Sequence, residues 1–300
     1  MRRLGDRYEL RHLLGRGGMG EVWAASDLLT GHEVAVKTVA GDATEAAGRL
    51  RHEAAVTAAV DHAGVVDVHD AGEDDAVAYL VMDLVPGTDL GELLLEGAVP
   101  ATEAVRIAAG VADALAATHR AGIVHGDVKP ANVVVNDGGV VLVDFGAASS
   151  GRAEPLAYGT AHYMAPEQAL TRVLTPATDI YALGCLLHAA LTGRPPFPGD
   201  SALAVLQRHA REQPPRLGEQ ARGVPPELDA LVARMLAKDP EQRGTAAQVR
   251  DGLAAVAGLG SLAGIEPLPA ADEPAGLDPQ ATLPAVTMLP GPAVSLPQAA

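Results

Sequence analysis

The chain reads His-Gly-Asp-Val-Lys-Pro-Ala-Asn at residues 125–132 and Asp-Phe-Gly at residues 144–146. Between them, two valine-rich runs flank Asn-Asp-Gly-Gly at 136–139, which predicts a β-hairpin. Because a hairpin returns the chain beside itself, with strands about 5 Å apart, we expect Asn132 and Asp144 to be neighbours at its open end. Their oxygens suit a hard cation such as Mg²⁺. With Asp127 and Lys129 just before them, these groups are the ones that handle a nucleotide phosphate.

The composition bounds the class of protein. The 300 residues are 48% hydrophobic, which is ample for the core of one large domain or two modest ones. The net charge is −16 and no basic run is longer than 49–52, which argues against nucleic acid or an anionic membrane as the main partner. The N-terminus does not read as a signal peptide, and the longest apolar stretch, 252–265, is too short to span a bilayer. We therefore expect a cytoplasmic protein with no membrane span.

Two rare residue types add to this. The single cysteine, Cys185, lies in an apolar run, so we expect it to be buried; a disulfide within the chain is excluded, which fits a reducing compartment. The only lysines are Lys37, Lys129 and Lys238, among 22 basic residues. Two of them fall inside motifs where a compact point charge cannot be exchanged for a guanidinium.

The first eighty residues read mostly as short strands. Residue character alternates along 8–14 and along 34–39, which is typical of half-buried strands. One helix interrupts them, with Asp42 as a cap and Glu45 three residues later, and its alanine-rich sequence continues to Val60. We expect a small antiparallel sheet with one helix.

The rest of the chain reads as helical from about residue 86. An apolar stripe through 105–116 predicts a helix that ends at Gly122. Residues 180–191 are apolar all round, which predicts a buried helix stopped at Gly193. Later helices are predicted at 228–236 and 246–256, and residues 258–300, rich in Pro, Ala and Gly, are predicted to be a disordered tail. The fold class is therefore α+β.

A glycine-rich segment, Gly-Arg-Gly-Gly-Met-Gly-Glu-Val at 15–22, follows the first long strand. Its pattern G-x-G-x-x-G-x-V lets backbone approach phosphates closely, which glycine allows cheaply. Taken alone, a glycine-rich hairpin turn would look the same. A dinucleotide-binding interpretation fails, because strand-like residues 23–25 follow instead of a helix.

Together these motifs resemble those of the eukaryotic-type (Hanks-type) bacterial serine/threonine protein kinases, over residues 8–257. The resemblance implies a bilobal fold, with a small lobe at 8–83 and a larger, mainly helical lobe at 84–257. It implies ATP and Mg²⁺, with Mn²⁺ as an alternative, in the cleft between them. It further implies transfer of the γ-phosphoryl group to serine or threonine residues of proteins, including the chain itself.

The resemblance also assigns roles to single residues. Lys37, in Val-Ala-Val-Lys, would grip the α- and β-phosphates and pair with Glu53, sixteen residues later, while Glu45 suits helix capping better. Asp127 would orient the substrate hydroxyl, and Lys129 would steady the transferred group. The implied catalytic residues are Lys37, Glu53, Asp127, Lys129 and Thr160, with Asn132 and Asp144 as metal ligands. The residues implied at the nucleotide are Leu14, Gly15, Arg16, Gly17, Gly18, Met19, Gly20, Val22, Ala35, Lys37, Met82, Asp83 and Val85.

Downstream, Gly-Thr-Ala-His-Tyr-Met-Ala-Pro-Glu at 159–167 resembles the substrate-docking loop of this family. The resemblance implies a buried Glu167–Arg243 ion pair, and it implies that Asp179 accepts backbone N–H bonds from the loop of Asp127. The hinge at 82–85 would meet adenine, and His125 is interpreted as a packed, structural histidine. Lys129 together with Thr160 favours serine or threonine over tyrosine as the acceptor.

Position 126 departs from many regulated members of the family, which have arginine there to grip an activation-loop phosphate. Gly126 cannot do this. We therefore expect activity to depend little on phosphorylation of Ser149, Ser150 or Thr160, although the two serines are the expected autophosphorylation sites.

Two rival functions remain. His-Gly-Asp also begins the corresponding loop in aminoglycoside and choline kinases, which do not need the segment 159–167. A pseudokinase scaffold is the second rival. Loss of a central polar residue would have indicated it, but Lys37, Glu53, Asp127, Asn132 and Asp144 are all present. In the tail, Thr282 or Thr287, once phosphorylated, could recruit a phosphothreonine-reading partner. Many relatives continue through a membrane helix into an external sensor; this sequence shows neither, so we expect a cytosolic input.

Overall fold

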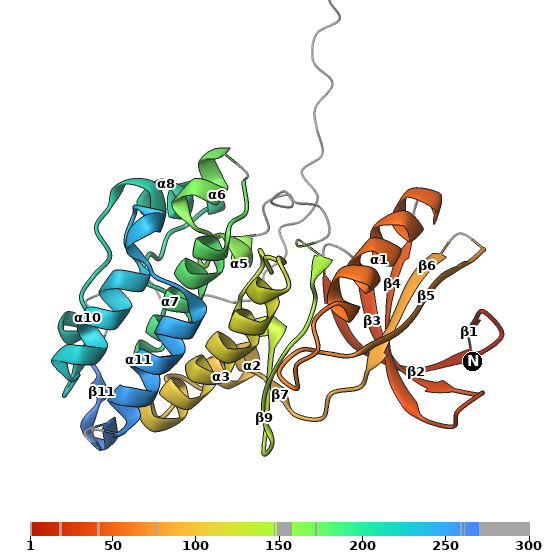
Figure 1. The fold of residues 1–300 in the computed structure, drawn as a ribbon, viewed down its shortest axis with the longest axis horizontal. Helices are drawn as coiled ribbons and strands as arrows, with labels where there is room; N and C mark the ends of the chain where they lie inside the picture. Colours follow the sequence, from red (N-terminus) through yellow and green to blue (C-terminus); the bar gives the residue numbers. More distant parts are fainter. Residues whose placement is uncertain are drawn as a thin grey trace, which may run out of the picture.

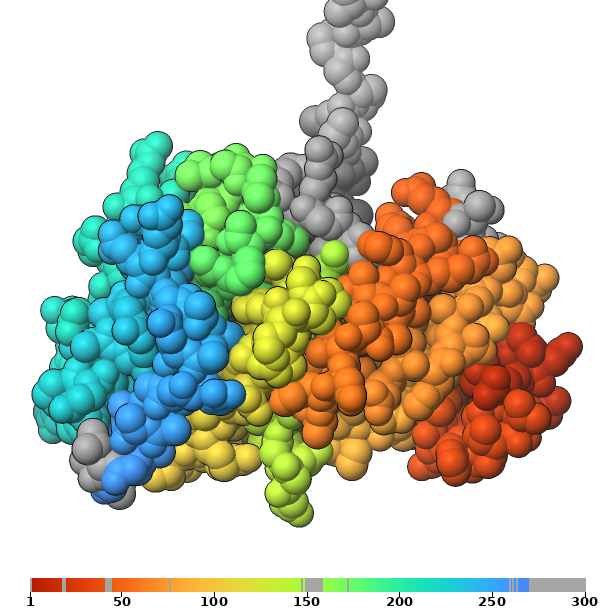
Figure 2. Space-filling model, in the orientation of Figure 1, coloured from red at the N-terminus to blue at the C-terminus, as the bar shows by residue number. Residues whose placement is uncertain are grey.

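The computed structural model describes residues 2–17, 20–40, 43–75, 77–146, 148, 158–171, 173–258, 260 and 262–269. Within them, residues up to 83, the N-lobe, form an antiparallel sheet with one helix, and the residues after 83, the C-lobe, are mainly helical. Figure 1 shows the sheet and α1 (Ala43–Ala58) at one end, the helices of the C-lobe at the other, and the hairpin of residues 133–142 between them. The space-filling view shows the same order, from red and orange through yellow to green and blue (Figure 2). The predicted α+β, two-lobed fold is confirmed.

The N-lobe sheet has the strand order β1-β2-β3-β4-β6-β5. Its strands are β1 (Arg3–Leu4), β2 (Tyr8–Gly17), β3 (Gly20–Asp27), β4 (Glu33–Ala40), β5 (Val68–Asp74) and β6 (Val77–Asp83). Side chains alternate across β4, so Val34 and Val36 pack in one cluster with Tyr8, while Val39 packs on the other face against α1. Lys37 shares the face of Val39, and this directs it toward α1.

The predicted alternation holds only for the first half of β2. Tyr8 and Leu10 are buried, whereas His12 and Leu14 are exposed. The pairing of β2 with β3 shifts register between Leu10 and His12 and again between Leu13 and Gly15. Such bulges re-aim the side chains that follow them, so the second half of β2 leaves the core.

Helix α1 (Ala43–Ala58) packs on the sheet through Ala46, Ala47 and Leu50. It ends two residues before the predicted end at Val60, and Val60 itself is buried in the main core of the C-lobe. The predicted cap, Asp42, lies outside the described residues.

The C-lobe is built around α7 (Pro176–Thr192), which is buried from Thr178 to Thr192. Thr175 caps its start, proline follows at the first helical position, and Gly193 ends it in the left-handed conformation. Helix α3 (Ala101–Arg120) packs against α7 and against α11 (Ala246–Gly258). These elements confirm the apolar stripe and the buried helix predicted from sequence. Further helical segments are α2 (Leu90–Leu95), η1 (Pro130–Asn132), α5 (Tyr158–Ala161), α6 (Pro166–Thr171), α8 (Ala202–Arg211), α9 (Leu217–Gln220), α10 (Pro226–Met235) and η2 (Pro240–Gln242).

The predicted hairpin is confirmed as β8 (Val133–Asn136) and β9 (Gly139–Leu142), with Asn136 opposite Gly139; β7 (Thr88–Asp89) pairs with β8. Leu142 joins this hairpin to the N-lobe. Its carbonyl accepts from Val66 N at 3.0 Å, and its N–H donates to Gly64 O at 2.8 Å. The hairpin is therefore fixed to both lobes.

Packed structure continues past the predicted domain end at residue 257. Leu262, in η3 (Leu262–Gly264), is buried in the main core, and β11 (Glu266–Pro267) pairs with β10 (Ala221–Arg222). The Pro- and Gly-rich composition hides this, because one buried leucine is enough to anchor a short segment. Residues 270–300, with Thr282 and Thr287, lie outside the described residues. Among the helices that the structure describes, none is both long and apolar enough to cross a membrane.

Candidate active site

Lys37 lies at the centre of a buried ionic cluster. Its Nζ is 2.9 Å and 3.1 Å from the two carboxylate oxygens of Glu53 on α1, and 2.7 Å from Asp144 Oδ1. Lys37 is 5% exposed and Glu53 is 4% exposed. The structure thus places Lys37 against Glu53, as the sequence suggested, and adds Asp144, which follows the hairpin.

Burial and charge act in opposite directions on these three groups. Burial alone would lower the pKa of Lys37, but the carboxylates of Asp144 and Glu53 raise it above its usual range. Burial raises the pKa of Glu53, against the pull of Lys37. Burial would also raise the pKa of Asp144, but the Lys37 ammonium holds it below its usual range. At neutral pH the cluster therefore keeps a cation on Lys37 and an ionised Asp144.

The loop 125–132 gathers the second group. Lys129 Nζ donates to Asp127 Oδ2 at 2.6 Å and to Thr160 Oγ1 at 3.4 Å. Asn132 Nδ2 donates to the backbone O of Asp127 at 2.9 Å and to its Oδ2 at 3.2 Å. The two bonds that reach the carboxylate of Asp127 from the described part of the chain both end at Oδ2. Its Oδ1 therefore remains available to a hydroxyl.

Asn132 and Asp144 meet at the open end of the hairpin, where Val143 N donates to Asn132 O at 3.0 Å. Asp144 has φ +63°, a left-handed conformation that is uncommon for residues other than glycine, although aspartate adopts it more readily than most, as Asp6 and Asp75 do here. Since Nδ2 of Asn132 donates to Asp127, Oδ1 is the atom of this amide that could serve, with the Asp144 carboxylate, as an oxygen donor to a cation. Mg²⁺ commonly takes one or two protein oxygens and completes its shell with phosphate oxygens and water, so this donor set fits it. Among the described residues, no group of three or more His, Cys, Asp or Glu could hold a metal.

An apolar cluster lies where the lobes meet. Ala35, Val66 and Met82 are buried in it, and further members are Val22, Val68, Leu84, Val85, Val141 and Val143. The sequence named Val22, Ala35, Met82 and Val85 but missed Val141 and Val143, which come from the C-lobe hairpin. Their spacing of two residues, which places both side chains on one face of the chain, was the sequence signal that could have identified them. Apolar walls of this kind suit a flat heterocyclic base.

Asp83 and Leu14 were also predicted to lie at the nucleotide. Asp83 N donates to Asp67 O at 2.9 Å, and the Asp83 carboxylate lies 2.6 Å from His69 Nε2. Leu14 is 47% exposed. Neither belongs to the apolar cluster.

The glycine-rich segment forms the β2–β3 hairpin, in which Gly17 pairs with Gly20; Gly18 and Met19 lie outside the described residues. A Cβ on Gly20 would overlap the carbonyl oxygen of Thr38, and its φ is +132°, so only glycine fits. A Cβ on Gly15 or Gly17 would meet nothing within 4 Å, which leaves room for a phosphate. Arg16 is directed at Glu21, 2.7 Å away.

Asp179 holds the start of the loop 125–132. It accepts from His125 N at 2.9 Å, from Gly126 N at 2.8 Å, and lies 2.8 Å from His119 Nε2. His125 is fully buried, with its ring centroid 4.5 Å from that of Phe145. The structure thus places Asp179 as the sequence suggested and His125 in a packed position.

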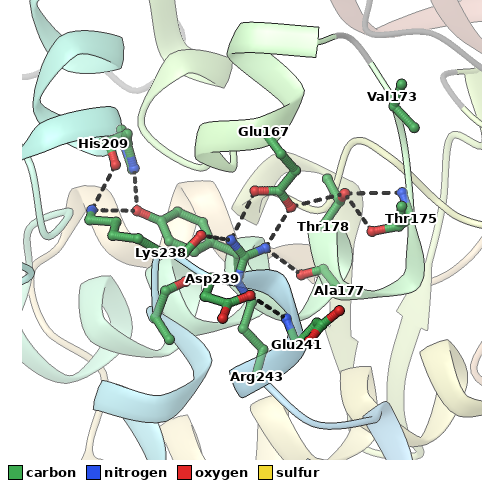
Figure 3. Close-up of polar contacts among 12 residues, drawn as sticks. Glu167, Val173, Thr175, Ala177, Thr178, His209, Lys238, Asp239, Glu241 and Arg243 are labelled. Atoms are coloured by element: carbon green, nitrogen blue, oxygen red, sulfur yellow. Dashed lines mark hydrogen bonds and ion pairs between the residues drawn. The ribbon is translucent and has the colours of Figure 1, made fainter.

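The helices α5 and α6, residues 158–171, form what we call the docking segment. Glu167 anchors it through two bonds to Arg243, of 2.6 Å and 2.8 Å, and accepts from Thr178 Oγ1 at 3.3 Å (Figure 3). Arg243 is fully buried and also donates to the carbonyls of Ala237, Ala177 and Lys238. The pair therefore ties α6 to α7 and to the chain around η2.

Sequence reasoning missed Gln168. It is buried on α6, and its Nε2 donates to the carbonyl oxygen of Gly126 at 2.9 Å. A glutamine after Ala-Pro-Glu reads only as part of a helix, so no local signal marked it.

Comparison with known proteins agrees with this geometry. The family model described as "Protein kinase domain" matches residues 8–252. A probable serine/threonine-protein kinase of Streptomyces coelicolor is 43% identical over 258 residues, covering 81% of this chain and 38% of the relative. Serine/threonine-protein kinase PknB of Mycolicibacterium smegmatis is 40% identical over 264 residues, covering 82% of this chain and 42% of the relative. The chain thus spans about two fifths of the length of these curated relatives. With its sheet lobe, its helical lobe and the polar groups between them, the chain belongs to the protein kinase family.

Proposed function

We propose that this chain transfers the γ-phosphoryl group of ATP to serine or threonine hydroxyls of proteins, itself included. One observation carries the proposal: Lys129 Nζ contacts both Asp127 Oδ2, at 2.6 Å, and Thr160 Oγ1, at 3.4 Å. This contact joins the expected base, a cation and a protein-docking segment at one point. A kinase of small molecules has no need of that segment.

Protein kinases use ATP with a divalent cation, and we propose Mg²⁺, replaceable by Mn²⁺, between Asn132 and Asp144. The cation would neutralise charge on the phosphates. The apolar cluster around Ala35 and Met82 would receive the base, and the β2–β3 hairpin would cover the phosphates. Lys37, held by Glu53, would fix the α- and β-phosphates.

The chain's own groups then divide the work of transfer. Asp127 Oδ1 would orient the acceptor hydroxyl and take its proton as the bond from the hydroxyl oxygen to the γ-phosphorus forms and the bond from that phosphorus to the β-phosphate oxygen breaks, which releases ADP. Lys129, already beside Asp127, offsets the negative charge of the moving phosphoryl group. Positioning supplies most of the rate, because the reacting atoms must be nearly in line.

We further propose that residues 8–257 form the kinase domain, against which 262–268 packs, and that the chain acts in the cytoplasm on protein substrates. Phosphorylated Thr282 or Thr287 in the tail would bind a phosphothreonine-reading partner. If mass spectrometry found the tail unmodified after autophosphorylation, the proposed binding of a phosphothreonine-reading partner would be wrong.

The deciding experiment follows phosphoryl transfer from labelled ATP with Mg²⁺ to the chain itself and to a generic basic protein. Asp127→Asn is the test variant, and Asp137→Asn, in the exposed turn of the hairpin, is its matched control. Label on serine or threonine that disappears only with Asp127→Asn supports the proposal. ATP binding without transfer favours a pseudokinase, and turnover on amino-alcohols alone favours a small-molecule kinase.

A further inference from the structure

Three successive backbone N–H groups leading into Asp127 are held by side chains. The N–H groups of His125 and Gly126 donate to Asp179, and that of Asp127 donates to His125 Nδ1 at 3.3 Å. The peptide group between Gly126 and Asp127 is held at its other end too, since its carbonyl accepts from Gln168 Nε2 at 2.9 Å. Of the side chains that hold these peptide groups, only Gln168 comes from the docking segment.

Gln168 is in a rigid setting. It is 5% exposed, and its neighbour Glu167 is locked by Arg243 and Thr178 (Figure 3). It also lines a cavity of about 10 Å³ between the docking segment, the loop 125–132 and the start of α7. The backbone of Gln168 is therefore held in place, and its buried amide lies between the docking segment and the loop 125–132.

Gly126 makes the orientation of the following peptide group depend on this bond. Its φ is +76°, and glycine, without a Cβ, permits large rotations of the peptide that follows it. That peptide sets the direction in which the Asp127 side chain leaves the backbone. A hydrogen-bond donor to the Gly126 carbonyl thus helps to orient the Asp127 carboxylate.

We propose that Gln168 is a positioning residue: its bond to the Gly126 carbonyl fixes the peptide before Asp127 and couples the docking segment to the base. The inference rests on the proposed function. The coupling runs through a neutral amide and a main-chain carbonyl, so it requires no phosphate on the chain.

The first test is Gln168→Met, which keeps the length of the side chain and removes the donor. We expect kcat to fall roughly 10- to 100-fold, the scale of a misaligned catalytic group. KM for ATP should stay unchanged, because Lys37 and the apolar cluster are untouched. The matched control is Gln248→Met, on the exposed side of α11, which removes a side-chain bond from Thr245 N and should keep the wild-type kcat. Wild-type kcat in Gln168→Met overturns the inference.

A pH profile separates positioning from packing. In Gln168→Glu an ionised carboxylate would repel the Gly126 carbonyl, whereas the protonated acid can donate to it. Burial, with Asp127 and Asp179 around the same cavity, raises the pKa of such a glutamate, and Tyr163 is the other titratable group there. The kcat ratio of Gln168→Glu to wild type should rise as pH falls, while that of Gln168→Met stays flat. A flat ratio for both variants contradicts the inference.

Hydrogen exchange gives a readout that needs no turnover. The amides of Gly126 and Asp127 should exchange faster in Gln168→Met than in wild type, and those of α11 should not. Unchanged exchange in the loop overturns the inference, whatever the activity. If the wild-type protein transferred no phosphate while Gln168→Met still exchanged these amides faster, only the proposed function would be contradicted.

Discussion

Lys37 Nζ lies 2.7 Å from Asp144 Oδ1, although the two residues are 107 positions apart in the sequence. The first comes from the middle of the N-lobe sheet and the second from the end of the C-lobe hairpin. Glu53 completes the cluster from α1. One buried ammonium thus joins both lobes and contacts a carboxyl group from each of them.

Lys37→Met should abolish phosphoryl transfer and also destabilise the fold. It leaves the buried Glu53 and the half-buried Asp144 without their counter-charge, at a cost of about 3–5 kcal/mol in the free energy of unfolding. Urea unfolding measures this loss. The double variant Lys37→Met, Glu53→Gln should regain part of the stability and none of the activity. Equal stability of the single and double variants would show that Glu53 needs no partner.

Breaking the Glu167–Arg243 pair should be similarly costly. Arg243→Met removes the counter-charge of Glu167, which keeps only its bond from Thr178, and removes the Arg243 donors to the carbonyls of Ala177, Ala237 and Lys238, so we expect a loss of about 3–5 kcal/mol. Thermal or urea unfolding tests it. Arg250→Met, which breaks an exposed pair with Asp113, is the control and should change little. A loss for Arg243→Met no larger than this control's contradicts the prediction.

Acid should destabilise the protein partly through His209. Burial, with Lys238 nearby, lowers the pKa of this histidine from its ordinary 6.5 to about 3 (Figure 3). Between these values the unfolded chain binds a proton that the folded chain excludes, so the free energy of unfolding falls as pH drops below 6.5. The slope from one such group approaches about 1.4 kcal/mol per pH unit.

Urea unfolding between pH 7 and 5 measures that slope. His209→Gln should reduce it by the amount that corresponds to the uptake of about one proton on unfolding. Burial also lowers the pKa of His188, to about 4, so part of the slope should remain. The control is His52→Gln on the exposed side of α1. If His52→Gln and His209→Gln gave the same slope, His209 would not be the group responsible.

Activity should survive removal of phosphate from the chain. Gly126 carries no side chain to grip a phosphate, while Asp179 and Gln168 hold its peptide groups directly. Protein treated with a phosphatase, and the double variant Ser149→Ala, Ser150→Ala, should keep most of the wild-type turnover in the labelled-ATP assay. The two serines lie outside the described residues. Loss of most turnover in the dephosphorylated protein would show that another group replaces the missing arginine.

The sequence by itself determined the features that depend on short spacings. Asp127, Lys129 and Asn132 lie within six residues, and an Asn-Asp-Gly-Gly turn can only bring Asp144 back beside them. The buried part of α7, predicted at 180–191, and its stop at Gly193 follow in the same way from local pattern, whereas the cap at Thr175 was not predicted. Family resemblance added the long-range pairs Lys37–Glu53 and Glu167–Arg243, which spacing alone does not reveal.

Only the tertiary structure decided which distant elements share a surface. The contact of Lys37 with Asp144, the place of Val141 and Val143 in the apolar cluster, and the bond from Gln168 to Gly126 each depend on how separate elements pack. The bulges of β2 and the buried Leu262 belong with them. Periodicity states which face of an element is apolar, but not which element will cover it. That choice is made by close packing over the whole core, where the identity of every neighbour counts.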